Sequence, residues 1–259
     1  MDHSEARHIR RMARGFTLIE LLVVIAIIAI LMAIIIPALR KAKESTRETV
    51  CRASLRSVGM GIFLYLQDND YVMANTNTTN GFFWYDASGN FRRTTDGDAY
   101  WGVAYKDYIR DTKVFGCPSF RKVAELIYSV DPMLIQEAAF GLNGYVSRTE
   151  SGQFKLLKTT DIRDQSKFII AHDHAEPRME QGARDMFHNT GLGTMNLTHY
   201  RQGGSRARFY PGIFRHNMRI NEALRTGGRA NVLWLDGHVS LLEETTGDDV
   251  PKWWYTGVK

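Results

Sequence analysis

A run of apolar residues extends from Leu21 to Ile36, and a single carboxylate, Glu20, stands at its start. Counted from Phe16, the segment has about 20 residues, which is the length that a helix needs to cross a hydrocarbon core of about 30 Å. No second apolar run of this length occurs in the 259 residues. The sequence therefore predicts one membrane-spanning helix followed by a soluble part that is large enough to bury its own core.

Glu20 needs a partner, because a carboxylate in hydrocarbon costs about 2.5–3.5 kcal/mol on insertion scales. A free α-amino group would serve. If the chain were cut between Gly15 and Phe16, the new ammonium at Phe16 would lie one helical turn from Glu20, or would meet Glu20 of a neighbouring subunit. The position of Glu20 thus predicts a processed N-terminus.

The residues around this point, Gly15 to Leu22, read Gly-Phe-Thr-Leu-Ile-Glu-Leu-Leu after a short basic leader. They resemble the class III signal of type IV pilins and of the pseudopilins of type II secretion systems. The resemblance implies that a prepilin peptidase cleaves after Gly15 and methylates the amine of Phe16. It also implies that homologous subunits assemble into a filament in which Glu20 neutralises the Phe16 amine of the next subunit.

Two other readings share the basic region and the apolar stretch, namely a conventional secretory signal and a plain membrane anchor. A conventional signal would be cut after its apolar region at small residues, and Ala33 and Ala38 offer only poor sites. An ordinary anchor has no need of a carboxylate near its cytoplasmic end. Both readings leave Glu20 unexplained.

The charges predict the orientation of the chain. Four arginines precede the apolar run, and the positive-inside rule keeps that side cytoplasmic. We therefore expect a single-pass inner-membrane protein whose C-terminal domain is periplasmic. The resemblance to pilins implies, in addition, a filament form that is periplasmic or extracellular. The formal net charge of +5 is spread without a Lys/Arg run, so we expect no nucleic-acid partner.

After Pro37 the apolar residues recur at three- and four-residue intervals, from Leu39 through Cys51 to Leu66, opposite a charged face. This pattern predicts that one helix runs from Phe16 to about Asp68, roughly 80 Å long, with a kink or a local opening at Pro37. The expected parts are a leader (1–15), a transmembrane helix (16–37), its amphipathic continuation (38–70) and a globular domain (71–259).

The remaining sequence favours short strands. We expect a hairpin of 82–85 with 91–93, a strand at 167–171, and a hairpin of 230–235 with 238–242. The last is joined by Asp236-Gly237, where both positions favour a positive φ. Scattered glycines between 182 and 204 suggest a long irregular insertion. The fold class is therefore α+β, a pilin-like long N-terminal helix packed on an antiparallel β-sheet.

The C-terminal half resembles proteins with a prepilin-type processing-associated domain, in segments 51–56, 114–119, 140–145 and 229–239. The signature of that family is a His followed after nine residues by Asp-Gly, and this sequence departs from it. Thr226 stands ten residues before Asp236, and the nearest histidine upstream is His216, which leaves nineteen intervening residues. We infer an insertion around residues 221–225.

Two cysteines, Cys51 and Cys117, would face an oxidising compartment, where they could form a disulfide. His216, Asp236 and His238 are candidate ligands for zinc or a similar ion. The triplet His172-Asp173-His174 adds further candidates. The alternative is structural, in which Asp-Gly makes a turn, His238 flanks it and His216 hydrogen-bonds the turn.

The catalytic reading finds little support, because no HExxH, nucleophile elbow or phosphate-binding loop occurs. We therefore expect a structural subunit of a type II secretion system or a type IV pilus-like filament, without enzyme activity or cofactor. The alternative is a membrane-anchored exported enzyme, or a metal- or ligand-binding domain, that uses the pilin signal only for export. The sequence leaves open which filament the subunit joins and whether it is a major or a minor component.

Overall fold

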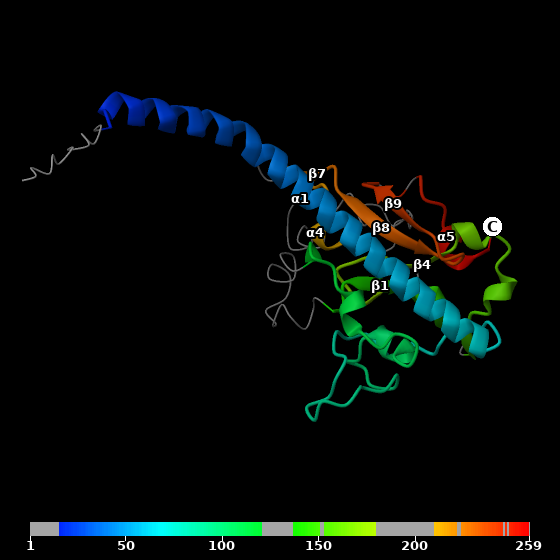
Figure 1. Ribbon diagram of the computed structural model, residues 1–259. Helices are drawn as coiled ribbons and strands as arrows, with labels where there is room; N and C mark the ends of the chain where they lie inside the picture. Colours follow the sequence, from blue (N-terminus) through cyan, green and yellow to red (C-terminus); the bar gives the residue numbers. More distant parts are fainter. Residues whose placement is uncertain are drawn as a thin grey trace, which may run out of the picture. The chain divides into compact units, whose positions relative to one another are not determined.

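The computed structural model describes residues 16–120, 137–150, 153–179, 210–221, 224–245, 247 and 249–258. Its longest element is helix α1, Leu18–Asp68, which confirms the single long N-terminal helix (Figure 1). Contacts divide the chain after Lys43 into two compact units, so the helix is shared between them. Pro37 lies inside α1, and because it carries no amide hydrogen the carbonyl of Ala33 lacks its usual donor.

The first unit contributes only the N-terminal part of α1 to the described residues, and its side chains are all exposed from Phe16 to Lys43. By length and composition α1 could cross a membrane. An apolar surface of this extent normally has a partner in lipid or protein. The predicted membrane segment is thus a helix with no tertiary partner among the described residues.

The second unit, residues 44–259, is built on a five-stranded sheet in the order β5-β1-β4-β8-β9. Its three neighbouring pairs from β1 to β9 are antiparallel, while β5 lies parallel to β1. The strands are β1 (Phe140–Asn143), β4 (Ile169–Asp173), β5 (Arg178–Met179), β8 (Arg229–Trp234) and β9 (Val239–Glu243). The α+β class is confirmed.

Smaller elements surround this sheet. Two further hairpins pair β2 (Ser147–Glu150) with β3 (Gln153–Leu156) and β6 (Arg219–Asn221) with β7 (Leu224–Thr226). Short α-helices are α4 (Tyr210–Ile213) and α5 (Trp253–Thr256). The 3₁₀ helices are η1 (Trp101–Tyr105), η2 (Thr112–Phe115), η3 (Gly144–Val146), η4 (Thr159–Asp161) and η5 (Gln165–Lys167).

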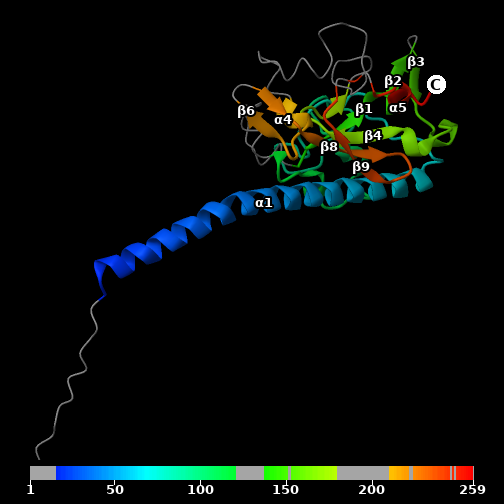
Figure 2. The same ribbon diagram turned by 90° about the horizontal axis from the view of Figure 1, so that it is seen from above.

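The sheet is covered on both faces. The C-terminal part of α1 runs along one face, and α4 and α5 lie against the other (Figure 2). The alternation along β8 explains this arrangement, because successive side chains of a strand point to opposite faces. Leu233 belongs to the core on the α1 side, whereas Val232 and Trp234 belong to the core on the α4 and α5 side.

The buried stripe of α1 begins at Cys51 and continues at three- and four-residue spacing through Leu55, Val58, Ile62 and Leu66. Glycines let the helix approach its neighbours closely. A Cβ added at Gly61 would lie 2.0 Å from Cγ1 of Ile109, and one at Gly59 would lie 2.7 Å from Cδ1 of Leu233. From Cys51 onward the predicted amphipathic stripe is therefore the face that packs on the domain, whereas Leu39, the predicted start of the stripe, is 63% exposed.

The predicted turns and strands differ from the structure in detail. Gly237 joins β8 to β9 with φ +87°, but Asp236 does not share the positive φ that the sequence suggested. Tyr85 and Phe91 form a single antiparallel bridge around the turn at 86–90, in place of the longer hairpin. The strand predicted at 167–171 begins at Ile169, because Lys167 ends η5. The glycine-rich stretch 182–204 lies outside the described residues.

A buried amide connects the C-terminus to the sheet. Asn143, at the end of β1, donates through Nδ2 to the carbonyl oxygens of Ile169 (2.8 Å) and Tyr255 (2.9 Å). Its Oδ1 accepts from the amide of Tyr145 at 3.0 Å. Asn143 is fully buried, so its three hydrogen bonds replace water completely and hold α5 against β4.

Candidate functional site

The first candidate site is the N-terminal turn of α1. Gly15, the predicted cleavage position, lies outside the described residues, whereas Phe16 and Glu20 lie within them and are exposed. Thr17 donates to Oε2 of Glu20 twice, from its amide and from its hydroxyl, each at 2.8 Å. The amide of Glu20 in turn donates to Oγ1 of Thr17 at 3.2 Å.

This reciprocal pattern is a capping box, in which Thr17 caps the helix and Glu20 reaches back to the cap residue. The spacing Thr-x-x-Glu before an apolar run is the sequence signal that could have predicted it. Glu20 therefore has a local role at the start of the helix in addition to the predicted pairing with an amine. The recorded hydrogen bonds to its carboxylate use Oε2, so Oε1 can face another group.

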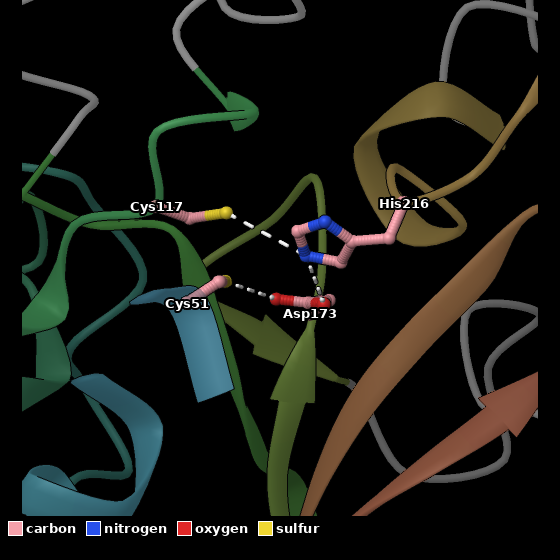
Figure 3. A group of neighbouring side chains, drawn as sticks. All are labelled: Cys51, Cys117, Asp173 and His216. Atoms are coloured by element: carbon pink, nitrogen blue, oxygen red, sulfur yellow. Dashed lines mark hydrogen bonds and ion pairs between the residues drawn. The ribbon is translucent and has the colours of Figure 1, made fainter. Parts of the chain in front are cut away.

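The second candidate site is a buried polar cluster of Cys51, Cys117, Asp173 and His216 (Figure 3). The four side chains come from distant parts of the sequence. Cys51 lies on α1, Cys117 follows η2, Asp173 ends β4, and His216 forms an isolated backbone bridge with Arg229 at the start of β8. Each is at most 2% exposed.

The donor atoms of this cluster point toward one another. Sγ of Cys51 lies 3.3 Å from Oδ1 of Asp173, and Nε2 of His216 lies 3.2 Å from Oδ2 of the same carboxylate. Sγ of Cys117 lies 3.8 Å from Nε2 of His216. One atom from each of the four residues can be chosen so that all lie within 4.8 Å of one another.

Polar groups around the cluster fix the orientation of Asp173. Asn231 donates to its Oδ2 from the backbone amide (2.7 Å) and from Nδ2 (3.0 Å). The buried guanidinium of Arg215 places Nε 3.7 Å from Oδ1, and it stacks over Phe120 at 4.4 Å from the ring centroid. The carboxylate is thus surrounded by donors.

These neighbours shift the titration of the cluster. Burial opposes ionisation of Asp173, but Arg215 and His216 outweigh it and lower the pKa of the carboxyl. Burial also disfavours the imidazolium of His216, yet its hydrogen bond to Asp173 raises the pKa to about 11. Burial is the main cause that raises the pKa of the Cys51 thiol. An ionic form of the cluster is therefore stabilised by its own members.

The cluster contains His216, one of the three main candidate ligands, and Asp173, a further candidate from the triplet. His238 lies on the exposed turn after β8, where Nδ1 is 2.6 Å from Oδ1 of Asp236 and the ring stacks on Trp234. Among the described residues, the potential ligand group includes His216 but neither Asp236 nor His238. His216 bridges Arg229 through its backbone and turns its ring toward Asp173, so it does not support the Asp236-Gly237 turn as the structural reading supposed.

His172 and His174, the neighbours of Asp173 in the triplet, make contacts outside the cluster. His172 lies 3.2 Å from the hydroxyl of Tyr255, on the α5 side of the sheet. His174 accepts the amide of Glu176 through Nδ1 at 2.9 Å. Burial lowers the pKa of His172 well below its ordinary value. Both histidines are therefore accounted for by local packing.

Cys51 and Cys117 are free thiols in this structure, brought into one cluster in the core. Their disulfide stays a prediction. The proximity of Cys117 to His216 also resembles the arrangement of a nucleophile and its base. Neither side chain is more than 2% exposed, so a substrate could not reach the sulfur without opening the fold.

The comparisons with known proteins match only parts of the chain. Residues 10–36 match the family model of the prokaryotic N-terminal methylation motif. The chain is 48% identical over 65 residues to a type IV wide pilus major component of Thermus thermophilus, covering 25% of this chain and 50% of the relative. It is 33% identical over 60 residues to a type II secretion system core protein G of Pseudomonas aeruginosa, covering 23% of this chain and 42% of that relative.

The chain spans about half the length of the curated relatives it matches. No solved structure matches. The matched region includes the capped start of α1 and its exposed apolar surface. The resemblance stated from residues Gly15 to Leu22 is confirmed: the chain carries the prokaryotic N-terminal methylation motif over residues 10–36, and it is similar to a type IV wide pilus component and to a type II secretion system core protein G.

Proposed function

We propose that the protein is a structural subunit of a type IV pilus-like or type II secretion filament. The observation that carries this proposal is the N-terminal segment, which joins the methylation motif to a helix whose residues 16–43 are all exposed. Such a surface fits lipid before assembly and the apolar parts of sister subunits after it. The names of the two relatives, a pilus component and a secretion core protein, support the same assignment.

In this proposal, the leader 1–15 remains on the cytoplasmic side of the inner membrane until a prepilin peptidase cuts after Gly15 and methylates the amine of Phe16. The helix from 16 to 37 holds the monomer in the membrane. Its continuation and the globular domain, 38–70 and 71–259, lie on the other side. Glu20 then pairs with the Phe16 amine of the next subunit, and this contact sets the axial register because other registers leave a buried charge unpaired.

The structural role is favoured over enzyme activity. Both curated relatives are filament or secretion components, and the one Cys–His pair of nucleophile type that the described residues bring together is buried. An exported enzyme or ligand-binding domain that uses the signal only as an anchor would have no need of assembly through α1.

The test is the N-terminal residue of the protein in two fractions, the membrane and the sheared or secreted material, read by mass spectrometry. We expect N-methylated Phe16 in both, and we expect Gly15→Val to retain the leader and to be missing from the filament fraction. Arg11→Lys is the matched control, because it keeps the leader charge and leaves Gly15 intact. Native protein that keeps residues 1–15 in the filament fraction would contradict the proposal.

A further inference from the structure

The buried cluster of Cys51, Cys117, Asp173 and His216 has the composition of a zinc site. Zinc in proteins is bound by thiolate sulfur, imidazole nitrogen and carboxylate oxygen, most often by four ligands in a tetrahedron. Two sulfurs, one nitrogen and one carboxylate meet here within 4.8 Å. A borderline-soft ion such as Zn²⁺ suits this mixture better than Mg²⁺ or Ca²⁺, which prefer oxygen ligands alone.

The distances between the donor atoms agree with a shared centre. Ligands at about 2.0–2.3 Å from a tetrahedral ion lie about 3.3–3.8 Å from one another. Sγ of Cys51 lies 3.3 Å from Oδ1 of Asp173, Nε2 of His216 lies 3.2 Å from Oδ2, and Sγ of Cys117 lies 3.8 Å from Nε2 of His216. One donor atom from each of the four residues lies within 4.8 Å of the others, so binding one ion requires the more distant donor atoms to move closer together.

The surroundings provide the supporting contacts that bound metals require. A ligating carboxylate is normally held by hydrogen bonds, and Asn231 holds Asp173 by two of them through Oδ2. A ligating histidine normally turns its other ring nitrogen toward a carboxylate. Nδ1 of His216 has no hydrogen bond among the described residues and faces Oε1 of Glu44 at 3.7 Å.

The charges of the fully buried groups also balance when His216 binds as the neutral imidazole. Two thiolates and one carboxylate carry three negative charges, while Zn²⁺ and the buried guanidinium of Arg215 carry three positive ones. The Glu44 side chain is 31% exposed and lies outside this count. Arg215 is fully buried and lies 3.7 Å from Asp173, so it belongs to the same low-dielectric region. A neutral assembly avoids the large penalty of a net charge in a protein core.

We propose that Cys51, Cys117, Asp173 and His216 bind one structural zinc ion in the core of the globular unit. The ion would tie α1 to the loop after η2, to the end of β4 and to the segment before β6. This ligand set differs from the His216, Asp236 and His238 combination that the sequence suggested. It also differs from a disulfide between Cys51 and Cys117, since one pair of sulfurs cannot do both.

The test is the metal content of the full chain, extracted from membranes in a mild detergent without chelator. We expect one zinc per chain, two free thiols after denaturation, and loss of zinc in Cys117→Ser. His238→Ala is the matched control, because it removes a histidine on the exposed turn and should keep the zinc.

Two further measurements separate metal binding from folding. Exchange of the wild-type protein into Co²⁺ should produce the intense visible bands of a tetrahedral thiolate complex. His216→Cys keeps four ligands, so it should retain the ion and shift those bands. Wild-type protein that holds a Cys51–Cys117 disulfide, or that neither contains nor takes up zinc under reducing conditions, would overturn the proposal. Processing after Gly15 and assembly through Glu20 would stand in either case.

Discussion

Glu20 has two roles that a pair of substitutions can separate. In the structure it completes a capping box with Thr17, and in the proposed filament it neutralises the amine of Phe16 in the next subunit. Glu20→Gln keeps the cap, because Gln is as suitable as Glu at this position of the box, but it removes the charge. Thr17→Ala does the reverse, since it removes the capping hydroxyl and leaves the carboxylate.

The two substitutions differ in the free energy that they cost. Replacing a Thr cap by Ala costs about 0.5–2 kcal/mol, and the effect falls on the first turn of a 51-residue helix. Leaving an ammonium buried without its counter-ion costs about 3–5 kcal/mol. At about 1.4 kcal/mol per factor of ten, Glu20→Gln should weaken each subunit contact by about 100-fold or more. We expect Thr17→Ala to weaken it by about 30-fold or less.

The assay compares the amount of each variant in the sheared filament fraction with the amount of processed protein in the membrane. Both variants should be cut after Gly15, which mass spectrometry of the N-terminus verifies. We expect Glu20→Gln to accumulate as processed monomer and Thr17→Ala to assemble. If Glu20→Gln assembled as well as the wild type while Thr17→Ala failed, the carboxylate would act only as a helix cap and the charge-pairing mechanism would be wrong.

Three further predictions concern the globular unit. Gly61→Ala should lower the melting temperature of the detergent-solubilised protein. Overpacking against Ile109 costs about 1–3 kcal/mol, which outweighs a helix-propensity gain of at most about 1 kcal/mol. An unchanged or higher melting temperature would refute the close approach of the helix to Ile109. Asn143→Leu should reduce the free energy of unfolding in urea by about 3 kcal/mol, since it removes three hydrogen bonds at about 1 kcal/mol each. Asp86 accepts two backbone amides, which lower its pKa from 3.8. The stabilisation from these two hydrogen bonds is present above pH 3.8 and is lost as the pH falls through the lower pKa of the folded state. Hydrogen exchange at the amides of residues 88 and 90 should therefore lose its protection at acid pH. In Asp86→Ala the same amides should already be weakly protected at neutral pH.

Local patterns were sufficient for the elements that depend on local physics. The spacing of apolar residues along α1 predicted the buried stripe from Cys51 to Leu66, because a helix face repeats every three to four residues. The Asp236-Gly237 pair predicted the β8–β9 turn, because Gly237 takes a positive φ at no steric cost. The exact strand ends and the parallel pairing of β5 depend on contacts between distant segments, which no local pattern contains.

Sequence reasoning named each residue of the polar cluster but did not group the four together, because their contacts join distant segments. Cys51, Cys117, Asp173 and His216 have no short-range spacing that marks a metal site, and only the sheet register and the packing of α1 bring them together. Proximity in sequence instead favoured Asp236 and His238, which bond to each other on an exposed turn. The capping box was within reach, since Thr17 and Glu20 stand three residues apart at the start of an apolar run.

The change in role along α1 occurs at a definite point. Residues 16–43 are all exposed, and Glu44 is the first that is partly buried. Its Oε1 lies 3.3 Å from the hydroxyl of Ser119, and Cys51, about two turns later, is the first fully buried residue of the helix. Among the described residues, those that α1 contributes to the buried core therefore all follow Lys43. A chain with this division can fold its domain while the helix start remains in lipid. The same apolar surface then stays available for sister subunits, and a zinc ion at Cys51 would reinforce the connection where the helix first becomes part of the core.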